Sequence, residues 1–387
     1  MDIRSLYINE LTEYCLENGY PKFRAKQIYE WLHKKHVSSA QDMNNIPKDI
    51  REKLDADIFS VKYVTHQTDP EDGTRKFLFE MEDGQMIETV FMRYEHGNSI
   101  CISSQAGCAM GCKFCASTIG GCIRNLTAGE MLGQVYEAMN IVKKEVALTE
   151  SSNTEVTSPK GSDKKGAEPK TNSSFHDKEK RKDVGEITNV VVMGTGEPFQ
   201  NYDNLIRFIK IITDEAGYNL SVRNITVSSC GIVPNIKKLA DEGLPVTFAL
   251  SLHAPTDELR KTIMPIANQY TIEETLEATD YYFNKTGRRI TIEYSLMSGI
   301  NDSKMEAEML GELLMAHNSR GNQHGIYHVN LIPINPVEER SFKANSSAGV
   351  ADFKKILEKN RINVTIRRGM GRNIDAACGQ LRRKYGL

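Results

Sequence analysis

Short apolar runs and longer amphipathic segments alternate from residue 99 to the end of the chain, and this alternation limits the possible folds more than any other feature. Apolar runs rich in β-branched residues predict strands, and the segments between them have helical periodicity. The predicted strands span residues 100–103, 188–193, 223–229, 246–251, 289–296, 327–333 and 363–367. Alternating strands and helices build parallel sheets, so we expect an α/β fold with a partial (β/α)6-type barrel.

Two regions precede the predicted barrel. Residues 1–58 have helical patterns and a basic surface, which predicts an N-terminal helical domain whose cations are either simply solvated or dock RNA. Residues 59–97 contain extended segments around the turn sequence 82–85, which predicts a β-hairpin extension.

The barrel is expected to occupy residues 98–368, followed by a C-terminal tail over residues 369–387. Residues 145–182 interrupt the barrel pattern with Ser, Thr, Lys, Glu and Asp and almost no large apolar side chains. Such a composition cannot bury enough apolar surface to become ordered. We therefore expect a flexible insertion in the first connection from helix to strand.

Composition and charge exclude several classes of protein. Hydrophobic residues make up 40% of the chain, and no apolar run reaches the length of a membrane span. We therefore expect a cytoplasmic protein that contacts no membrane, in which the eight cysteines are ligands and catalysts and not a disulfide framework. A net charge of −2 excludes a general polyanion binder, so any nucleic acid must be held by local basic patches.

Three cysteines, Cys108, Cys112 and Cys115, follow the first predicted barrel strand with the spacing C-x3-C-x2-C. A structural zinc site needs four ligands, and no fourth follows at zinc-finger spacing. A C-x-x-C redox pair would leave Cys108 unexplained, and three buried structural cysteines are the remaining alternative. Three thiolates can hold an iron–sulfur cluster with one iron open to a small molecule. The spacing resembles that of radical S-adenosylmethionine (SAM) enzymes, which implies a [4Fe–4S] cluster that binds SAM.

Polar clusters follow five of the predicted strands, and in barrels of parallel strands such clusters meet at the carboxyl edge. The glycines of Gly194-x-Gly196 allow a ligand to approach the backbone, and the Glu197 carboxylate can accept a hydrogen bond from the ammonium group of SAM. Each residue taken alone is more often part of an ordinary turn. Together they predict a SAM site that contains Gly196, Glu197, Ser228, Ser251, Leu252, His253 and Asn335.

The tail carries Cys378 between small neighbours and close to several arginines. Small neighbours leave the sulfur accessible, and the arginines would lower the pKa of the thiol and hold phosphates. The alternative is a small hydrophobic residue that anchors the C-terminus.

Four motifs together resemble the RlmN/Cfr family of radical SAM RNA methyltransferases: Cys101-Ile-Ser-Ser-Gln-Ala-Gly-Cys108, Gly194-Thr-Gly-Glu-Pro198, Ser251-Leu-His-Ala-Pro255 and Asp375-Ala-Ala-Cys-Gly-Gln-Leu381. The resemblance implies that one SAM methylates Cys378 and that a second SAM, bound to the cluster, yields a radical that activates this methyl group for addition to adenine. It further implies that Cys101 releases the RNA by forming a transient disulfide with Cys378, and that Glu88 is the proton acceptor.

The resemblance also implies the substrate. RlmN-type enzymes methylate carbon 2 of adenosine 2503 of 23S rRNA, in the peptidyl-transferase centre, and adenosine 37 of some tRNAs. Cfr-type enzymes modify carbon 8 of the same rRNA adenosine and give antibiotic resistance. Pro198 and the sequence Pro333-Ile-Asn-Pro336 are similar to the RlmN type, whereas Cys230 departs from its usual serine. A flavodoxin-like or ferredoxin-like electron donor is implied, and we expect a monomer.

Two other functions are compatible with a cluster and are distinguished by the paired cysteines. A radical SAM lyase or activase would have no use for Cys101 and Cys378, and an iron–sulfur RNA-binding regulator would not explain the SAM-binding edge. Three further cysteines have no assigned role: Cys15, Cys122 and Cys230.

Overall fold

The computed structural model describes residues 2–59, 61–154, 185–318, 325–334, 339–371, 373–374 and 381–382, with the side chains of 149–154 excepted. Two residues of the predicted site, Asn335 and Cys378, lie outside this part of the chain. The strands are β1 (Val61–Thr68), β2 (Arg75–Met81), β3 (Met86–Tyr94), β4 (Gly97–Cys101), β5 (Gln105–Gly107), β6 (Cys122–Asn125), β7 (Ile187–Val192), β8 (Ile225–Ser229), β9 (Thr247–Ser251), β10 (Ile290–Leu296), β11 (Tyr327–Pro333) and β12 (Asn363–Ile366). The α-helices are α1 (Ile8–Glu17), α2 (Phe23–His33), α3 (Lys48–Asp55), α4 (Ala128–Thr154), α6 (Tyr202–Ile212), α7 (Val233–Asp241), α8 (Asp257–Ile263), α9 (Ile272–Thr286), α10 (Lys304–Asn318) and α11 (Ser347–Lys359).

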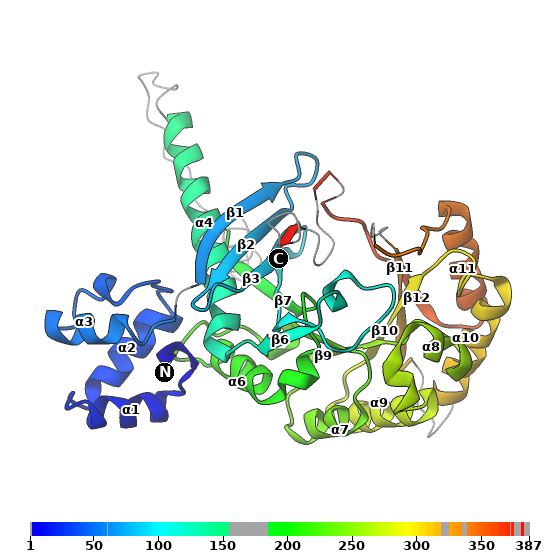
Figure 1. Cartoon of the computed structure of the whole chain (residues 1–387), viewed down its shortest axis with the longest axis horizontal. Helices are drawn as coiled ribbons and strands as arrows, with labels where there is room; N and C mark the ends of the chain where they lie inside the picture. Colours follow the sequence, from blue (N-terminus) through cyan, green and yellow to red (C-terminus); the bar gives the residue numbers. More distant parts are fainter. Residues whose placement is uncertain are drawn as a thin grey trace, which may run out of the picture.

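A ten-stranded sheet forms the frame of the molecule, with the order β1-β2-β3-β4-β7-β8-β9-β10-β11-β12. From β4 to β12 all neighbouring strands are parallel, and helices cover the outer side of the curved sheet (Figure 1). The predicted α/β barrel is therefore confirmed, and each of the predicted barrel strands is present. Because all these strands run in one direction, their carboxyl ends lie along one edge of the sheet.

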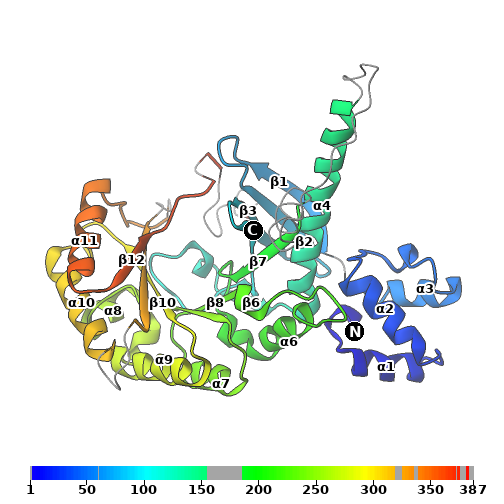
Figure 2. The same cartoon turned by 180° about the vertical axis from the view of Figure 1, so that it is seen from behind.

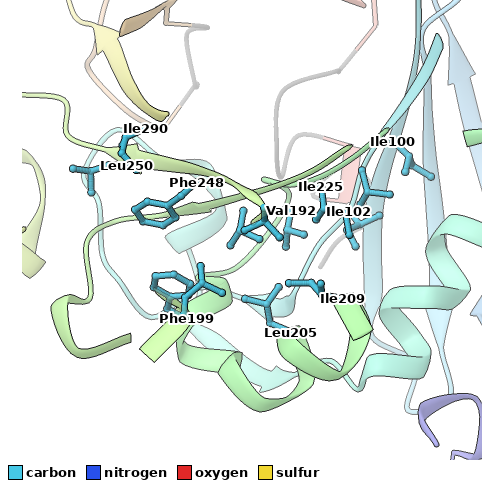
Figure 3. Packing of buried hydrophobic residues seen from close by; sticks show 14 of the residues in the cluster. Ile100, Ile102, Val192, Phe199, Leu205, Ile209, Ile225, Phe248, Leu250 and Ile290 are labelled. Carbon is cyan, nitrogen blue, oxygen red and sulfur yellow. The ribbon is translucent and has the colours of Figure 1, made fainter. Parts of the chain in front are cut away.

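The barrel core lies between the sheet and its outer helices. Phe199, Leu205 and Ile209 pack against strand residues such as Ile225 and Phe248, and all of them are buried (Figure 3). Strands covered on one side by helices bury every second residue on that side. The opposite face is therefore free to carry polar side chains.

The N-terminal helices α1, α2 and α3 enclose an apolar core of their own, which includes Ile28, Leu32 and Leu54. This unit sits beside α4 and α6, at the opposite end of the molecule from α10 and α11 (Figure 2). It is tied to the barrel by polar contacts: the Tyr29 hydroxyl donates to Asp214 at 2.7 Å, and the Gly129 N–H donates to Ser5 Oγ at 2.8 Å.

The segment before the barrel contains one strand more than the predicted hairpin. Strands β1, β2 and β3 form an antiparallel meander, and β3 pairs antiparallel with β4, which makes the extension continuous with the barrel sheet. Phe77 and Phe91 enter the main apolar core. The register pairs Lys76 with Val90 and Val90 with Cys101, so these three residues share the opposite face.

Helix α4 continues to Thr154, past residue 145 where the insertion was predicted to begin. Glu145 forms an ion pair with Arg75 and lies 3.8 Å from His66, so the β-meander supports this part of the helix. The predicted start of the insertion was therefore too early. The rest of the predicted insertion lies outside the described residues. None of the described helices is both long and apolar enough to cross a membrane.

The substitution Gly129→Ala should loosen the contact between the N-terminal helices and the barrel. A Cβ at this position would lie 1.9 Å from Asp2 Oδ2 and 2.9 Å from Ser5 Oγ. We expect the free energy of unfolding to fall by about 1–3 kcal/mol, the usual cost of overpacking. Urea unfolding followed by the fluorescence of Trp31, the one tryptophan of the chain, measures this in the N-terminal unit. Gly349→Ala is the control, because its Cβ would lie 3.3 Å from the nearest atom; equal stability of the two variants would contradict the expectation.

Candidate functional site

A cavity of about 280 Å³ opens at the carboxyl edge of the barrel strands. Most of the residues predicted for the cluster and SAM line it together: Cys108, Cys112, Cys115, Gly196, Glu197, Ser228, Ser251 and His253. They come from the loops after β5, β7 and β9 and from β8 and β9 themselves. Residues far apart in the sequence are therefore brought to one site, as the parallel topology predicts.

The cysteine loop is fixed through its backbone. The Lys113 N–H donates to the Ile263 carbonyl at 2.9 Å, which docks the loop on the end of α8. The Thr118 hydroxyl donates to the Cys115 carbonyl at 2.9 Å, and Arg340 donates to the same carbonyl at 3.3 Å. These bonds hold the backbone and leave the three sulfurs free for ligation.

Burial raises the pKa of the Cys108 thiol to about 12 and that of Cys112 further, with the neighbouring cysteines adding to both shifts. Thiols in such surroundings give up their protons when a metal replaces them. No described cysteine is in a disulfide, and no three metal-ligating side chains of the described residues converge as one metal ion requires. Three cysteine thiols that line one cavity are the donors that hold iron–sulfur clusters in proteins, so these residues fit a [4Fe–4S] cluster.

Glu197 is buried, and its carboxylate accepts the Phe199 N–H at 3.0 Å and the Cys230 N–H at 2.9 Å. It therefore joins the ends of β7 and β8, in addition to any contact with a ligand. Gly196 has a φ of +114°, and a Cβ there would lie 2.7 Å from the Gln105 side chain. This glycine is required by the close approach of two loops of the protein itself.

Ser228 and Ser251 face each other across β8 and β9, with their hydroxyl oxygens 3.3 Å apart. His253 is buried, and its Nδ1 accepts the Ser295 N–H at 2.9 Å, which leaves Nε2–H as a donor. Burial lowers the pKa of His253 to about 3, so the ring is neutral at physiological pH. Leu252 is fully buried and does not line the cavity; its carbonyl accepts from Arg260 at 3.2 Å.

Cys101 ends β4 beside the cavity. Its side chain is buried, which raises the pKa of the thiol, while the Arg367 charge, the Met193 N–H and Lys76 favour the thiolate. Met193 itself lines the cavity, so Cys101 lies next to the predicted SAM site although it does not line it.

Glu88 and Lys76 form a buried ion pair on the same face as Cys101, with 2.9 Å between Lys76 Nζ and Glu88 Oε2. Glu88 Oε1 accepts the backbone N–H of Arg382 at 2.7 Å. Arg382 of the C-terminal tail is thus held against β3, the strand next to Cys101.

Glu293 and Arg367 also line the cavity, and the sequence analysis did not assign them to the site. Glu293 is buried in β10, where Asn330 donates to its carboxylate at 2.9 Å. Burial raises the pKa of Glu293, and the Arg367 charge opposes this shift. A glutamate in the predicted strand 289–296 was a usable signal, because a buried carboxylate in an apolar strand needs a polar partner.

His253→Gln should make the stability of the protein less dependent on pH. Below the ordinary pKa of 6.5, the unfolded chain binds a proton at His253 that the folded protein excludes. Stability is therefore complete above pH 6.5 and falls toward pH 5, by about 1.4 kcal/mol per pH unit from this residue. A glutamine at position 253 can still accept the Ser295 N–H through its side-chain oxygen, and it has no titrating group, so the fall in stability below pH 6.5 should disappear. Urea unfolding at pH 7 and pH 5 measures the change in the free energy of unfolding between the two pH values. His96→Gln, at an exposed position, is the control. The same change in wild type and His253→Gln would refute the prediction.

Comparison with known proteins agrees with this geometry. Residues 1–59 match the ribosomal RNA large subunit methyltransferase N-terminal domain, and residues 102–309 match the radical SAM superfamily. Two relatives named "Probable dual-specificity RNA methyltransferase RlmN", from Lachnospira eligens and Lachnoclostridium phytofermentans, are 48% and 46% identical, covering 99% and 100% of this chain and 96% and 95% of their own.

The solved structure of a radical SAM methyltransferase from Sphaerobacter thermophilus superposes with a TM-score of 0.81 at 38% identity, covering 98% of each chain. Both the sequence relatives and this structure span the whole length of the protein. The chain therefore belongs to the RlmN family of radical SAM RNA methyltransferases, which use a [4Fe–4S] cluster and SAM.

Proposed function

We propose that this enzyme methylates carbon 2 of adenosine 2503 in 23S rRNA, and adenosine 37 of some tRNAs, by means of a methyl group carried on Cys378. The names of the relatives support dual specificity. The observation that carries the mechanism is the 2.7 Å bond from the Arg382 N–H to Glu88. It attaches the tail, in which Cys378 precedes Arg382 by four residues, to the strand beside Cys101.

The roles of the cavity residues follow from their chemistry. Cys108, Cys112 and Cys115 hold the cluster, which when bound supplies the electron that cleaves SAM reductively. SAM is held by Gly196, Glu197, Ser228, Ser251, His253 and Asn335, whereas the buried Leu252 does not reach the cavity. The remaining lone pairs of the Glu197 carboxylate accept from the SAM ammonium group, and the neutral His253 donates from Nε2 without adding charge.

Cys101 releases the product. Its thiolate attacks the sulfur of Cys378, and the new S–S bond forms as the bond between that sulfur and the transferred carbon breaks, leaving the electron pair on carbon. The carbon takes a proton from water to become the methyl group of the product, and a dithiol reductant then supplies two electrons and two protons to return the disulfide to the two thiols. Burial raises the pKa of the Cys101 thiol, and the Arg367 and Lys76 charges offset part of this rise and so favour the thiolate form that this step requires. Glu88 accepts the proton that leaves the adenine ring, and the Lys76 ammonium group, 2.9 Å from Glu88 Oε2, holds this carboxylate in place.

RNA is bound by local basic patches, since the chain has a net charge of −2. The N-terminal helical unit offers exposed Lys34 and Lys35, and the Lys35 ammonium lies 3.4 Å from the centre of the Trp31 ring. The protein acts as a cytoplasmic monomer that receives electrons from a flavodoxin-like or ferredoxin-like donor.

Cys101→Ala should trap the enzyme on its RNA. The methyl carrier Cys378 is intact in this variant, but no thiol cleaves the carbon–sulfur link. We expect a covalent protein–RNA adduct on a denaturing gel, with turnover reduced at least 100-fold. Cys378→Ala should give neither adduct nor product, and Cys122→Ala, outside the cavity, should behave as wild type. Free turnover of Cys101→Ala would reject the two-cysteine mechanism, and mass spectrometry of wild-type product distinguishes carbon 2 from carbon 8.

Cys112→Ala should remove the cluster while the fold is kept, because two thiolates cannot replace three. After anaerobic reconstitution, the variant should lack the brown iron–sulfur absorbance and produce no 5′-deoxyadenosine from SAM. Cys122→Ala, at the start of β6, the next strand after the cysteine loop, again serves as control. A Cys112→Ala protein that still cleaves SAM would overturn the ligand assignment.

A further inference from the structure

Arg260 is a fully buried guanidinium in α8 that bonds only to backbone. Its Nη2 donates to the carbonyls of Cys230 at 2.7 Å and Ser251 at 3.4 Å, and its Nε donates to the Leu252 carbonyl at 3.2 Å. Its Nη1 has no hydrogen-bond partner within the part of the chain that the structure describes. Among the described residues, no carboxylate lies within ion-pair distance of this side chain.

A buried charge without an opposite charge is strongly unfavourable, because water is lost and nothing equivalent replaces it. Carbonyl oxygens compensate for part of this loss. The remainder implies that an anion lies nearby when the protein is functional.

Asp257, on the same helix, is a carboxylate whose charge acts on Arg260, and the cluster loop is a further place for an anion. The Ile263 carbonyl at the end of α8 accepts the Lys113 N–H at 2.9 Å, and Cys112 packs in the same small apolar cluster as Ile263 and Met264. The Arg260 charge acts electrostatically on the sulfurs of Cys112 and Cys230.

The backbone of Cys230 connects the Arg260 side chain to Glu197, which lines the cavity. Its N–H donates to Glu197 at 2.9 Å, and its carbonyl accepts from Arg260 at 2.7 Å. Arg260 therefore both fixes the loops after β8 and β9 and brings a positive charge close to Cys112 in the cluster loop.

We propose that Arg260 is the buried counter-ion of the [4Fe–4S] cluster and raises its reduction potential. A cluster bound by three thiolates is anionic, and it gains one further negative charge when a low-potential one-electron donor reduces it, with no bond made or broken. A fixed cation nearby stabilises the reduced form more than the oxidised form. The inference requires the cluster but not the proposed RNA specificity.

The test compares Arg260→Gln, which removes the charge, with Arg260→Lys, which keeps it. Both variants lose the planar arrangement of donors that holds the three carbonyls. The midpoint potential of the reconstituted protein is measured by dithionite titration followed by electron paramagnetic resonance, without SAM or RNA. We expect a clearly more negative potential for Arg260→Gln and a potential close to wild type for Arg260→Lys.

Arg288→Gln is the matched control. Arg288 donates to the Arg223 carbonyl at 3.2 Å and to Thr247 Oγ1 at 2.7 Å, at the other end of β9 from the cluster loop. The midpoint potential of the cluster in Arg288→Gln should equal that in the wild-type protein. If Arg260 acts only by fixing loops, Arg260→Gln and Arg260→Lys will both lower stability and SAM affinity with unchanged potential, and this outcome would overturn the proposal.

Asp257→Asn provides a second route if Arg260→Gln does not retain a cluster. Asp257 is the carboxylate whose charge acts on Arg260 from the same helix, and its Oδ1 accepts the Ile272 N–H, which asparagine can still do. Removing this negative charge should make the potential less negative. An unchanged potential in Asp257→Asn would then refute the proposal. A normal potential shift with no RNA methylation would instead count against the proposed function.

Discussion

The parallel pairing of β4 and β7 to β12 is the constraint on which the site depends. It sends the cysteine loop, Glu197, Cys230 and His253 to one edge of the sheet, although they are spread over more than a hundred residues of sequence. Backbone hydrogen bonds between neighbouring loops then fix each group, as in the bond from the Cys230 N–H to Glu197. The cavity is therefore a consequence of strand direction, and its chemistry depends on which residues follow each strand.

The antiparallel meander adds a second function to the same sheet. Because side chains alternate along strands, the pairing of Val90 with Cys101 separates the aromatic face that packs under α4 from the face that carries Lys76, Glu88 and Cys101. A shift of one residue would exchange the two faces. The register thus decides that the C-terminal tail meets Glu88 beside Cys101, next to the cavity, and not at a remote surface.

Several buried charged side chains surround the site, and they differ in how fully opposite charges or hydrogen bonds compensate them. Lys76 and Glu88 form an ion pair at 2.9 Å, Glu197 accepts two backbone N–H groups, and Arg260 is compensated only in part, by three carbonyls. Such arrangements cost stability unless geometry and partners are good. Their concentration around one cavity is typical of a site that receives charged cofactors, since an anionic cluster and a cationic sulfonium both need fixed countercharges.

The sequence by itself determined the order of the strands along the chain and picked out the three cysteines and most of the polar residues that line the cavity, because these depend on local periodicity and on motifs of a few residues. It did not identify Arg260, Glu293 or the continuation of α4 to Thr154. It also assigned Leu252 to the SAM site, although this side chain is buried and does not line the cavity. Only the tertiary structure decided these points. A buried arginine or glutamate resembles an exposed one in sequence, and its role depends on which distant loops and charges pack against it.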